Sequence, residues 1–350
     1  MIGPGFARAL LAWYDRNKRD LPWRRGPNAY RTLVSELMLQ QTAVATVVPY
    51  FERFTTRFPT MQALAAARED EVLALWSGLG YYSRARHLHR TAQVVVGELG
   101  GELPANEDDL LRLPGVGAYT AAAVAAIAFS KRTLPVDGNV ARVLARILGE
   151  HRPIDRPAVR AELRQQGQAC VPTRRPGDFA QAMMELGALC CVPREPRCLE
   201  CPMARFCRSR ADGTTATIPV RAKRIAKRRI HMACVAVERR GCLLLVRRPP
   251  KTLLAGTWVF PLQEMRTGET AVDAARRALA SLGLRLEGGL VPAGDLRHIF
   301  THRDVTASVF RARARGEVES ADARWVRSDE LALLPLSSFG RKMIDLVSRR

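Results

Sequence analysis

The spacing of apolar residues changes near residue 230, and this change restricts the chain to two different kinds of domain. Between residues 6 and 208, apolar residues recur at helical spacing in segments separated by Pro and Gly. After residue 230, short apolar runs such as 234–237 and 242–246 are typical of strands. With 350 residues the chain is also too long for a single core. The sequence therefore predicts an all-α domain followed by an α+β domain.

The charge between these two parts predicts where they separate. Residues 221–229 contain six Lys or Arg and no acidic residue, and like charge disfavours a packed core. We therefore expect a helical domain over 1–208, a basic interdomain linker over 209–229 and an α+β domain over 230–350. Helices are expected over 30–54, 61–76, 84–99, 117–130, 139–149, 178–189 and, in the second domain, 270–282.

The chain carries a large positive charge. It contains 55 Lys and Arg against 34 Asp and Glu, a formal excess of 21. Such a field attracts polyanions, of which nucleic acid is the commonest, although a basic surface can also serve solubility alone. Because no stretch is apolar enough to span a membrane and the N-terminus lacks the pattern of a secretory signal, we expect a cytoplasmic protein with no membrane partner.

Four of the eight cysteines, Cys191, Cys198, Cys201 and Cys207, fall within one short stretch. Thiolates are soft ligands that suit an iron–sulfur cluster or zinc. Structural zinc sites usually show two tight ligand pairs, whereas only Cys198 and Cys201 form such a pair here. The wider outer gaps favour a 4Fe–4S cluster, with zinc or reduced structural cysteines as alternatives, and the adjacent Cys190 leaves the first ligand ambiguous.

A glycine-rich turn and two carboxyl groups are the other candidate functional features. Gly115 and Gly117 flank one apolar residue before a predicted helix, which is typical either of a phosphate-binding hairpin or of a plain turn. Asp137 can cap the helix that follows it. Glu36 shares a helical stripe with Thr32 and Gln40. That stripe either faces water or lines a cleft, where desolvation would make Glu36 a proton donor.

In this order, the hairpin, the aspartate and the four-cysteine loop resemble the helix-hairpin-helix DNA glycosylase superfamily. More narrowly, the chain is similar to the adenine DNA glycosylase (MutY) family, and the similarity extends from about residue 6 to 208 and more weakly beyond 230. The segments that carry it are Leu21–Arg24, Ser35–Thr42, Gly78–Arg86 and Val136–Arg142. The resemblance implies a helical glycosylase domain with a 4Fe–4S loop over 191–207, followed by a nudix-like domain.

The resemblance also implies a substrate and a chemistry. Members of this family excise adenine paired with 8-oxoguanine or guanine in duplex DNA, and the adenine must leave the base stack to be reached. Glu36 would protonate adenine and later activate water, while an ionised Asp137 would stabilise positive charge on the sugar. Tyr119 and Asn139 would support this pair. We accordingly expect a bacterial enzyme that is associated with the nucleoid through DNA.

Further family positions imply contacts with DNA. Gln41 and Tyr81 would wedge into the duplex, and Arg24 would lie at the adenine pocket. The full set of expected DNA- and adenine-binding residues is Arg24, Gln41, Thr42, Tyr81, Gly115 and Gly117. Where the related endonuclease III family has Lys, this chain has Tyr119, so no Schiff base can form and we expect base removal without efficient strand cleavage.

The C-terminal part resembles a nudix fold that has lost its hydrolytic site. A working nudix enzyme needs carboxylates on a helix to hold magnesium, and the corresponding stretch 274–284 contains none. The resemblance instead implies recognition of 8-oxoguanine by a loop formed by Phe300, Thr301 and His302, although a plain packing loop is the alternative.

Three other functions are compatible with parts of the pattern. One is a bifunctional glycosylase for oxidised pyrimidines, which the presence of Tyr119 and Glu36 disfavours. The second is a non-catalytic protein that binds damaged DNA, in which Glu36 is solvated and Asp137 is only a helix cap. The third is a zinc-dependent DNA-binding module.

Overall fold

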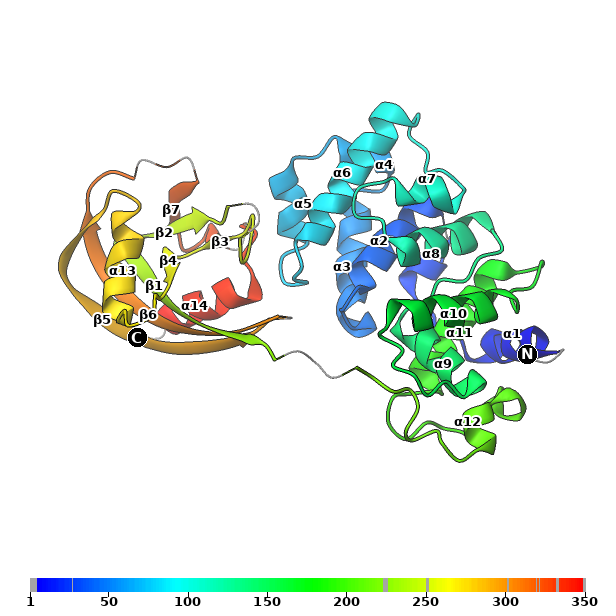
Figure 1. The fold of residues 1–350 in the computed structure, drawn as a ribbon. Helices are drawn as coiled ribbons and strands as arrows, with labels where there is room; N and C mark the ends of the chain where they lie inside the picture. The colour runs from blue at the N-terminus through cyan, green and yellow to red at the C-terminus, as the bar shows by residue number, and fades with distance from the viewer. Residues whose placement is uncertain are drawn as a thin grey trace. The chain divides into compact units, whose positions relative to one another are not determined.

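The computed structural model describes residues 5–26, 28–222, 226–249, 252–300, 302–318, 320, 322–331 and 334–348. The chain separates into two compact units (Figure 1). The helical unit contains residues 1–67 and 87–224, and the sheet unit contains residues 68–86 and 225–350. Segment 68–86 therefore groups with the C-terminal residues although it lies within the helical part of the sequence.

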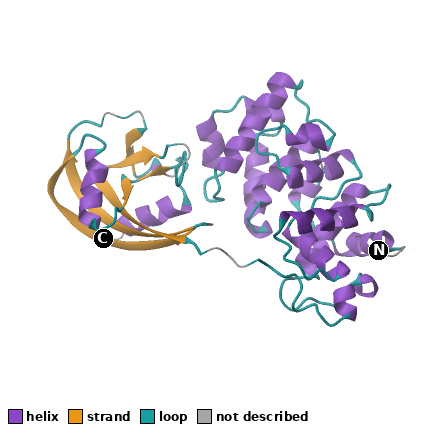
Figure 2. Cartoon of the chain, in the orientation of Figure 1, coloured by secondary structure: helices purple, strands orange, loops and turns teal. Residues whose placement is uncertain are grey.

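The helical unit is built from helices joined by short loops, as Figure 2 shows in purple and teal. Its elements are α1 (Phe6–Asn17), η1 (Pro22–Arg24), α2 (Ala29–Leu39), α3 (Val44–Arg57), α4 (Met61–Ala65), α6 (Ser83–Glu98, which begins in the sheet unit), α7 (Glu107–Leu111), α8 (Ala118–Phe129), α9 (Gly138–Leu148), α10 (Pro157–Gln168), α11 (Pro176–Leu189), η2 (Ala204–Phe206) and α12 (Arg208–Ala211).

Helix α8 lies at the centre of this unit. Its sequence is almost entirely Ala and other apolar residues, and residues 120–126 are all buried. It packs against α2, α7 and α11, which its small side chains allow to approach closely. At the start of α11, a Cβ on Gly177 would lie only 2.6 Å from the Ala126 carbonyl oxygen, so glycine is required for this helix crossing. The close packing brings α2, α8 and α11 around one cavity.

Two helices predicted as continuous are interrupted. The prediction of one helix over 30–54 is wrong, because α2 ends at Leu39 and α3 begins at Val44. Gln41, between them, has a positive φ of 58°, which no helix interior accommodates. The predicted helix over 61–76 is likewise divided into α4 and α5 (Glu69–Leu75) by the extended backbone of Arg68. Apolar spacing continues across both breaks, so periodicity alone does not reveal them.

The segment expected to be a linker makes defined contacts over its first part. Ile218 is buried in the helical core, and its carbonyl oxygen accepts a hydrogen bond from Arg146 Nε at 2.8 Å. Arg221 forms an ion pair with Asp155 at 2.8 Å. Residues up to 224 group with the helical unit, and β1 begins at Arg228.

The sheet unit is a mixed sheet covered by helices. Its elements are α5, β1 (Arg228–Arg239), β2 (Cys242–Arg247), β3 (Trp258–Val259), β4 (Leu262–Glu264), α13 (Ala271–Ala280), β5 (Arg285–Ile299), β6 (Arg303–Arg315), β7 (Ala323–Arg327) and α14 (Ser338–Ser348). The main strand order is β3-β2-β1-β6-β5, with β4 pairing with β1 and β7 with β2. The strands β1 and β6 are parallel, whereas the other strand pairs are antiparallel.

The central strand β1 is buried on both faces. Met232, Cys234 and Ala236 contribute to one apolar cluster with α14, while Val235 and Val237 contribute to another with α13. The turn into β2 passes through Arg240 and Gly241, both at positive φ, which suits a tight hairpin. The edge strand β5 was not predicted, because glycines and charged residues interrupt its alternation and its pairing with β6 shifts between Glu287 and Val291. No helix among the described residues is long and apolar enough to cross a bilayer.

Candidate active site

A cavity of about 820 Å³ lies within the helical unit. Its walls come from α1, η1, α2, α8, α9, α10 and α11 and from the loops between them. Seven of the residues expected from the sequence line it, namely Arg24, Glu36, Gln41, Thr42, Tyr119, Asp137 and Asn139. Segments more than one hundred residues apart in the chain thus contribute to a single site.

Glu36 is a buried carboxyl group on the α2 wall. The stripe it shares with Thr32 and Gln40 faces this cavity, and the side chain is only 5% exposed. Its Oε2 atom accepts a hydrogen bond of 2.6 Å from the Tyr119 hydroxyl of α8. Burial, together with the negative charge of Asp137, raises the pKa of Glu36 to about 7, although the hydrogen bond from Tyr119 and the charge of Arg24 oppose the shift. Glu36 can therefore hold a proton near neutral pH.

Asp137 is the N-cap of α9 and also lines the cavity. Its Oδ1 accepts the Val140 backbone N–H at 2.7 Å, and its Oδ2 accepts the Asn139 side-chain amide at 3.0 Å. Burial raises the pKa of Asp137 above its usual value, and these hydrogen bonds act in the opposite direction. The cap and the functional interpretation are thus compatible, since the carboxylate that caps α9 also lines the cavity.

Asn139 is held from behind by an arginine of the same helix. The Nη2 atom of Arg142 donates to Asn139 Oδ1 and to the Gly187 carbonyl, each at 2.8 Å, and its Nε donates to the Cys191 carbonyl at 2.8 Å. A Cβ on Gly187 would lie 2.7 Å from the Asn139 Cβ, so glycine lets α11 close onto this residue. Because these contacts fix Asn139, they also fix the carboxylate of Asp137.

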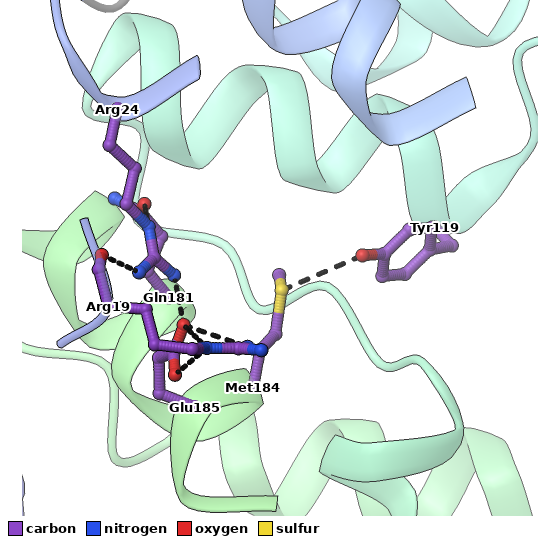
Figure 3. A network of polar contacts seen from close by, with 6 residues as sticks. All are labelled: Arg19, Arg24, Tyr119, Gln181, Met184 and Glu185. Atoms are coloured by element: carbon purple, nitrogen blue, oxygen red, sulfur yellow. Dashed lines mark hydrogen bonds and ion pairs between the residues drawn. The ribbon is translucent and has the colours of Figure 1, made fainter. Parts of the chain in front are cut away.

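Arg24 enters the cavity from η1 and is held by α11, as Figure 3 shows. Its Nη2 forms an ion pair of 2.7 Å with Glu185, and its Nε donates to Gln181 Oε1 at 3.0 Å. Glu185 has a side-chain exposure of 1% and also forms an ion pair with Arg19 at 2.9 Å. In the same view, Met184 lies against the Tyr119 hydroxyl, with Sδ 3.6 Å from it.

Sequence reasoning missed Gln181 and Glu185. Both lie on α11, four residues apart and therefore on one helix face, and they interrupt the apolar residues that follow Asp178 in that helix. That interruption was the available signal. It was overlooked because a single acidic residue in a helix most often faces water.

The two hairpin glycines and Tyr81, which were expected to contact DNA, lie outside the cavity lining. Gly115 is exposed with a φ of 72°, and a Cβ there would lie 2.3 Å from the Cβ of His87. Gly117 is the exposed N-cap of α8. Tyr81 belongs to segment 68–86, has a φ of 50° and is 45% exposed. The side chain of Tyr81 is therefore presented to solvent.

The four clustered cysteines and the adjacent Cys190 line one small cavity together with Arg146 and Arg210. All four are free thiols, and Arg146 Nη1 donates to the Cys191 Sγ at 3.3 Å. Such an N–H group stabilises negative charge on sulfur, so the donor set and its surroundings fit a thiolate-bound group. Within the described part of the chain, no three His, Cys, Asp or Glu side chains are arranged to hold a single metal ion.

The loop expected to read 8-oxoguanine lies after β5. The Phe300 ring is 4.5 Å from the His298 ring and 5.9 Å from the Phe339 ring, so it packs against the sheet unit, while His302 is exposed. Thr301 lies outside the described residues.

Helix α13 contains one carboxylate, Asp273, whose Oδ2 accepts a hydrogen bond of 2.6 Å from the Thr270 hydroxyl at the helix N-terminus.

Comparison with known proteins identifies both parts of the chain. Residues 34–168 match the HhH-GPD superfamily of base excision DNA repair proteins, and residues 232–346 match the NUDIX domain. The human adenine DNA glycosylase is 38% identical over 97% of this chain and 73% of the relative. The adenine DNA glycosylase of Mycolicibacterium smegmatis is 45% identical over 62% of this chain and 74% of the relative.

Solved structures agree with the fold of the helical unit. A thermostable thymine-DNA glycosylase superposes with a TM-score of 0.54 and 30% identity over 59% of this chain and 95% of that chain. Endonuclease III in a non-covalent complex with DNA superposes with a TM-score of 0.51 at 24% identity over 59% of this chain and 94% of that chain, a likeness of fold. The chain belongs to the adenine DNA glycosylase family, with an HhH-GPD helical domain followed by a NUDIX-like α+β domain.

Proposed function

We propose that this glycosylase removes adenine paired with 8-oxoguanine or guanine in duplex DNA, and that Glu36 and Asp137 carry out the chemistry. The observation that carries the proposal is the pair itself. One carboxyl group with a pKa near 7 and a second held by an amide and a backbone N–H line the same cavity. Groups with such separate environments are typical of an acid and its partner in glycoside hydrolysis.

In the first step, the C1′–N9 bond breaks and its electron pair leaves with adenine. The Glu36 carboxyl group transfers its proton to N7, so the base departs neutral. The Tyr119 hydroxyl, 2.6 Å from Oε2, orients the carboxyl group and stabilises the carboxylate that remains. Asp137, held by Asn139 and the Val140 amide, faces the positive charge that develops at C1′.

In the second step, water completes the reaction. The Glu36 carboxylate accepts a proton from a water molecule as its oxygen bonds to C1′, and this proton restores the starting state of Glu36. No amine is available at position 119 to attack C1′, so the product is an abasic site in an intact strand.

The remaining site residues bind the substrate. Arg24 lies at the base pocket, Gln41, Thr42 and Tyr81 contact the opened duplex, and the amides at Gly115 and Gly117 bind a phosphate. The side chains of Phe300, Thr301 and His302 read the opposite 8-oxoguanine. Support for that loop is the exposure of His302.

Cys191, Cys198, Cys201 and Cys207 hold a 4Fe–4S cluster in this proposal. The cluster, once bound, crosslinks the loop and stabilises its fold. The shared cavity of the four thiols and the N–H donor of Arg146 support this. The purified protein should be brown and contain iron and acid-labile sulfide in equal amounts, whereas a colourless protein that contains zinc would contradict the cluster.

The decisive experiment uses a duplex with adenine opposite 8-oxoguanine. We expect free adenine to be released and the strand to break only after alkali treatment. Strand breaks without alkali would instead indicate a bifunctional enzyme. Binding of the duplex without release of any base would indicate a protein that only binds damaged DNA.

A further inference from the structure

The active-site cavity contains one arginine for which the described part of the chain provides no acceptor. Arg160 lies in the first turns of α10 and is half-buried. Its Nε atom is buried and has no hydrogen-bond partner among the described residues. Buried donors in folded proteins are nearly always paired, and an unpaired one costs stability unless a ligand or water satisfies it. Arg160 is therefore positioned to receive an acceptor from outside the chain.

The other cations that line the cavity already have partners. Arg19 and Arg24 both form ion pairs with Glu185, at 2.9 Å and 2.7 Å. Arg25 is paired with Asp20, and Lys18 lies over the ring of Tyr14. Among the ion pairs of the described residues none includes Arg160 or Lys18, and Lys18 lies over an aromatic ring, so Arg160 is the lining cation for which the described residues show neither a carboxylate nor a ring as partner.

The place of Arg160 in the cavity indicates which anion it would bind. Helix α10 packs against α9, and Arg160 lines the same cavity as Asp137, Gly138 and Asn139 at the start of α9. In the proposed function, C1′ of the extruded adenosine lies at Asp137. The nucleotide's own phosphodiesters are the anions that necessarily accompany that sugar into the site. The N–H groups of a guanidinium form a planar fork that matches two phosphate oxygens.

We propose that Arg160 binds the non-bridging oxygens of a phosphodiester next to the extruded adenosine. This inference rests on the proposed function, because it places the sugar at Asp137. The contact neutralises the phosphate that must enter the cavity beside the negative carboxylate. Arg160 thus contributes to binding of the extruded nucleotide and takes no part in proton transfer.

The test compares Arg160→Met with a matched variant of the same helix, Arg156→Met. Arg156 is exposed, lies one turn earlier and does not line the cavity. Binding is measured in a Glu36→Gln background, so that no substrate is consumed. Two further duplexes carry an uncharged methylphosphonate in place of the phosphate on the 5′ or the 3′ side of the adenosine.

We expect Arg160→Met to weaken binding of the all-phosphate duplex about tenfold, as the loss of a charge-assisted fork contact predicts. The slope of log K against log salt should become less steep by about 0.9, the contribution of one phosphate. On the duplex whose methylphosphonate replaces the contacted phosphate, Arg160→Met should cost nothing further. Arg156→Met should have the same effect on all three duplexes.

Two results would overturn the proposal. One is an Arg160→Met variant that binds the all-phosphate duplex as tightly as its parent. The other is an equal loss on all three duplexes, which would show that Arg160 acts through the fold. Thermal unfolding of Arg160→Met and Arg160→Lys checks that the fold is retained, and Arg160→Lys should recover part of the binding. If instead the wild-type protein fails to release adenine, the proposed function fails, which is a different outcome from either of these.

Discussion

The helical unit and residues 225–350, here called the sheet domain, differ in where their charged side chains lie. The helical unit buries Glu36, Arg142, Arg146 and Glu185, each at 5% exposure or less. Among the described residues of 225–350, the buried polar side chains are the uncharged Thr257 and Ser337. Charged side chains of that domain, such as Arg297 and Asp304, instead pair at its surface.

This difference indicates where chemistry can occur. A buried carboxyl group loses its hydration, so its pKa moves towards neutral pH and it can transfer protons. An exposed ion pair keeps nearly ordinary protonation and contributes little beyond solubility or recognition. This difference supports the proposed function, in which the helical unit carries out catalysis and the sheet domain binds DNA.

The largest expected effect is on catalysis by the buried acid. Glu36→Gln should lower the single-turnover rate of adenine release by about a thousandfold, within the range for loss of a general acid and base. Binding of the same duplex should be nearly unchanged, because Gln has the same shape. A matched change in the sheet domain, Glu269→Gln, should leave the rate as it is. Normal release of adenine by Glu36→Gln would contradict the assignment of chemistry to this cavity.

The next largest effect is on stability, because ionisation of the buried Glu36 carboxyl group costs free energy in the folded state. Its folded pKa of about 7 lies above its ordinary value of 4.5, so folding favours the protonated form. The contribution of this carboxyl group to wild-type stability is therefore lost as pH rises from about 4.5 to 7. Above pH 7 that contribution no longer changes with pH. Above pH 8, Glu36→Gln should stabilise the helical unit by about 3 kcal/mol, the equivalent of this shift at about 1.36 kcal/mol per pKa unit.

Urea unfolding of both proteins at pH 5 and pH 8.5 measures this difference. The stabilisation should be several times smaller at pH 5, where the wild-type carboxyl group is protonated in the folded state. Equal differences at the two pH values would show that Glu36 has an ordinary pKa and that the contrast between the two regions is not electrostatic.

The smallest expected effect concerns the sheet domain. His302→Ala should reduce the preference for 8-oxoguanine over guanine about tenfold, as loss of one hydrogen bond to a base predicts, without changing the rate opposite guanine. His231→Ala, an exposed histidine of β1, is the matched control. Steady-state kinetics on the two duplexes measures both variants. A lower rate on both duplexes with His302→Ala would give the sheet domain a part in catalysis.

Local sequence patterns predicted most of the helices and strands but few of the breaks within them or the contacts between them. The helix over 139–149 was predicted and is observed as Gly138–Leu148, because an aspartate cap and a glycine stop are local signals. The break at Gln41 was missed, since a positive φ at a non-glycine residue leaves no local mark. Glu185 was missed for a similar reason, because its two arginine partners, Arg19 and Arg24, lie more than 150 residues earlier in the chain.

The sequence by itself determined the two-domain order, the absence of the nudix carboxylates and the presence of Tyr119 in place of lysine, because each depends on residue identity or short-range spacing. It left open whether Glu36 faces water or a cleft. Only the tertiary structure decided that, by packing α8 against α2 and α11 against α8 so that Glu36 lost its solvent and gained Tyr119 at 2.6 Å. Desolvation depends on every neighbour in space, and no single segment of a chain carries that information.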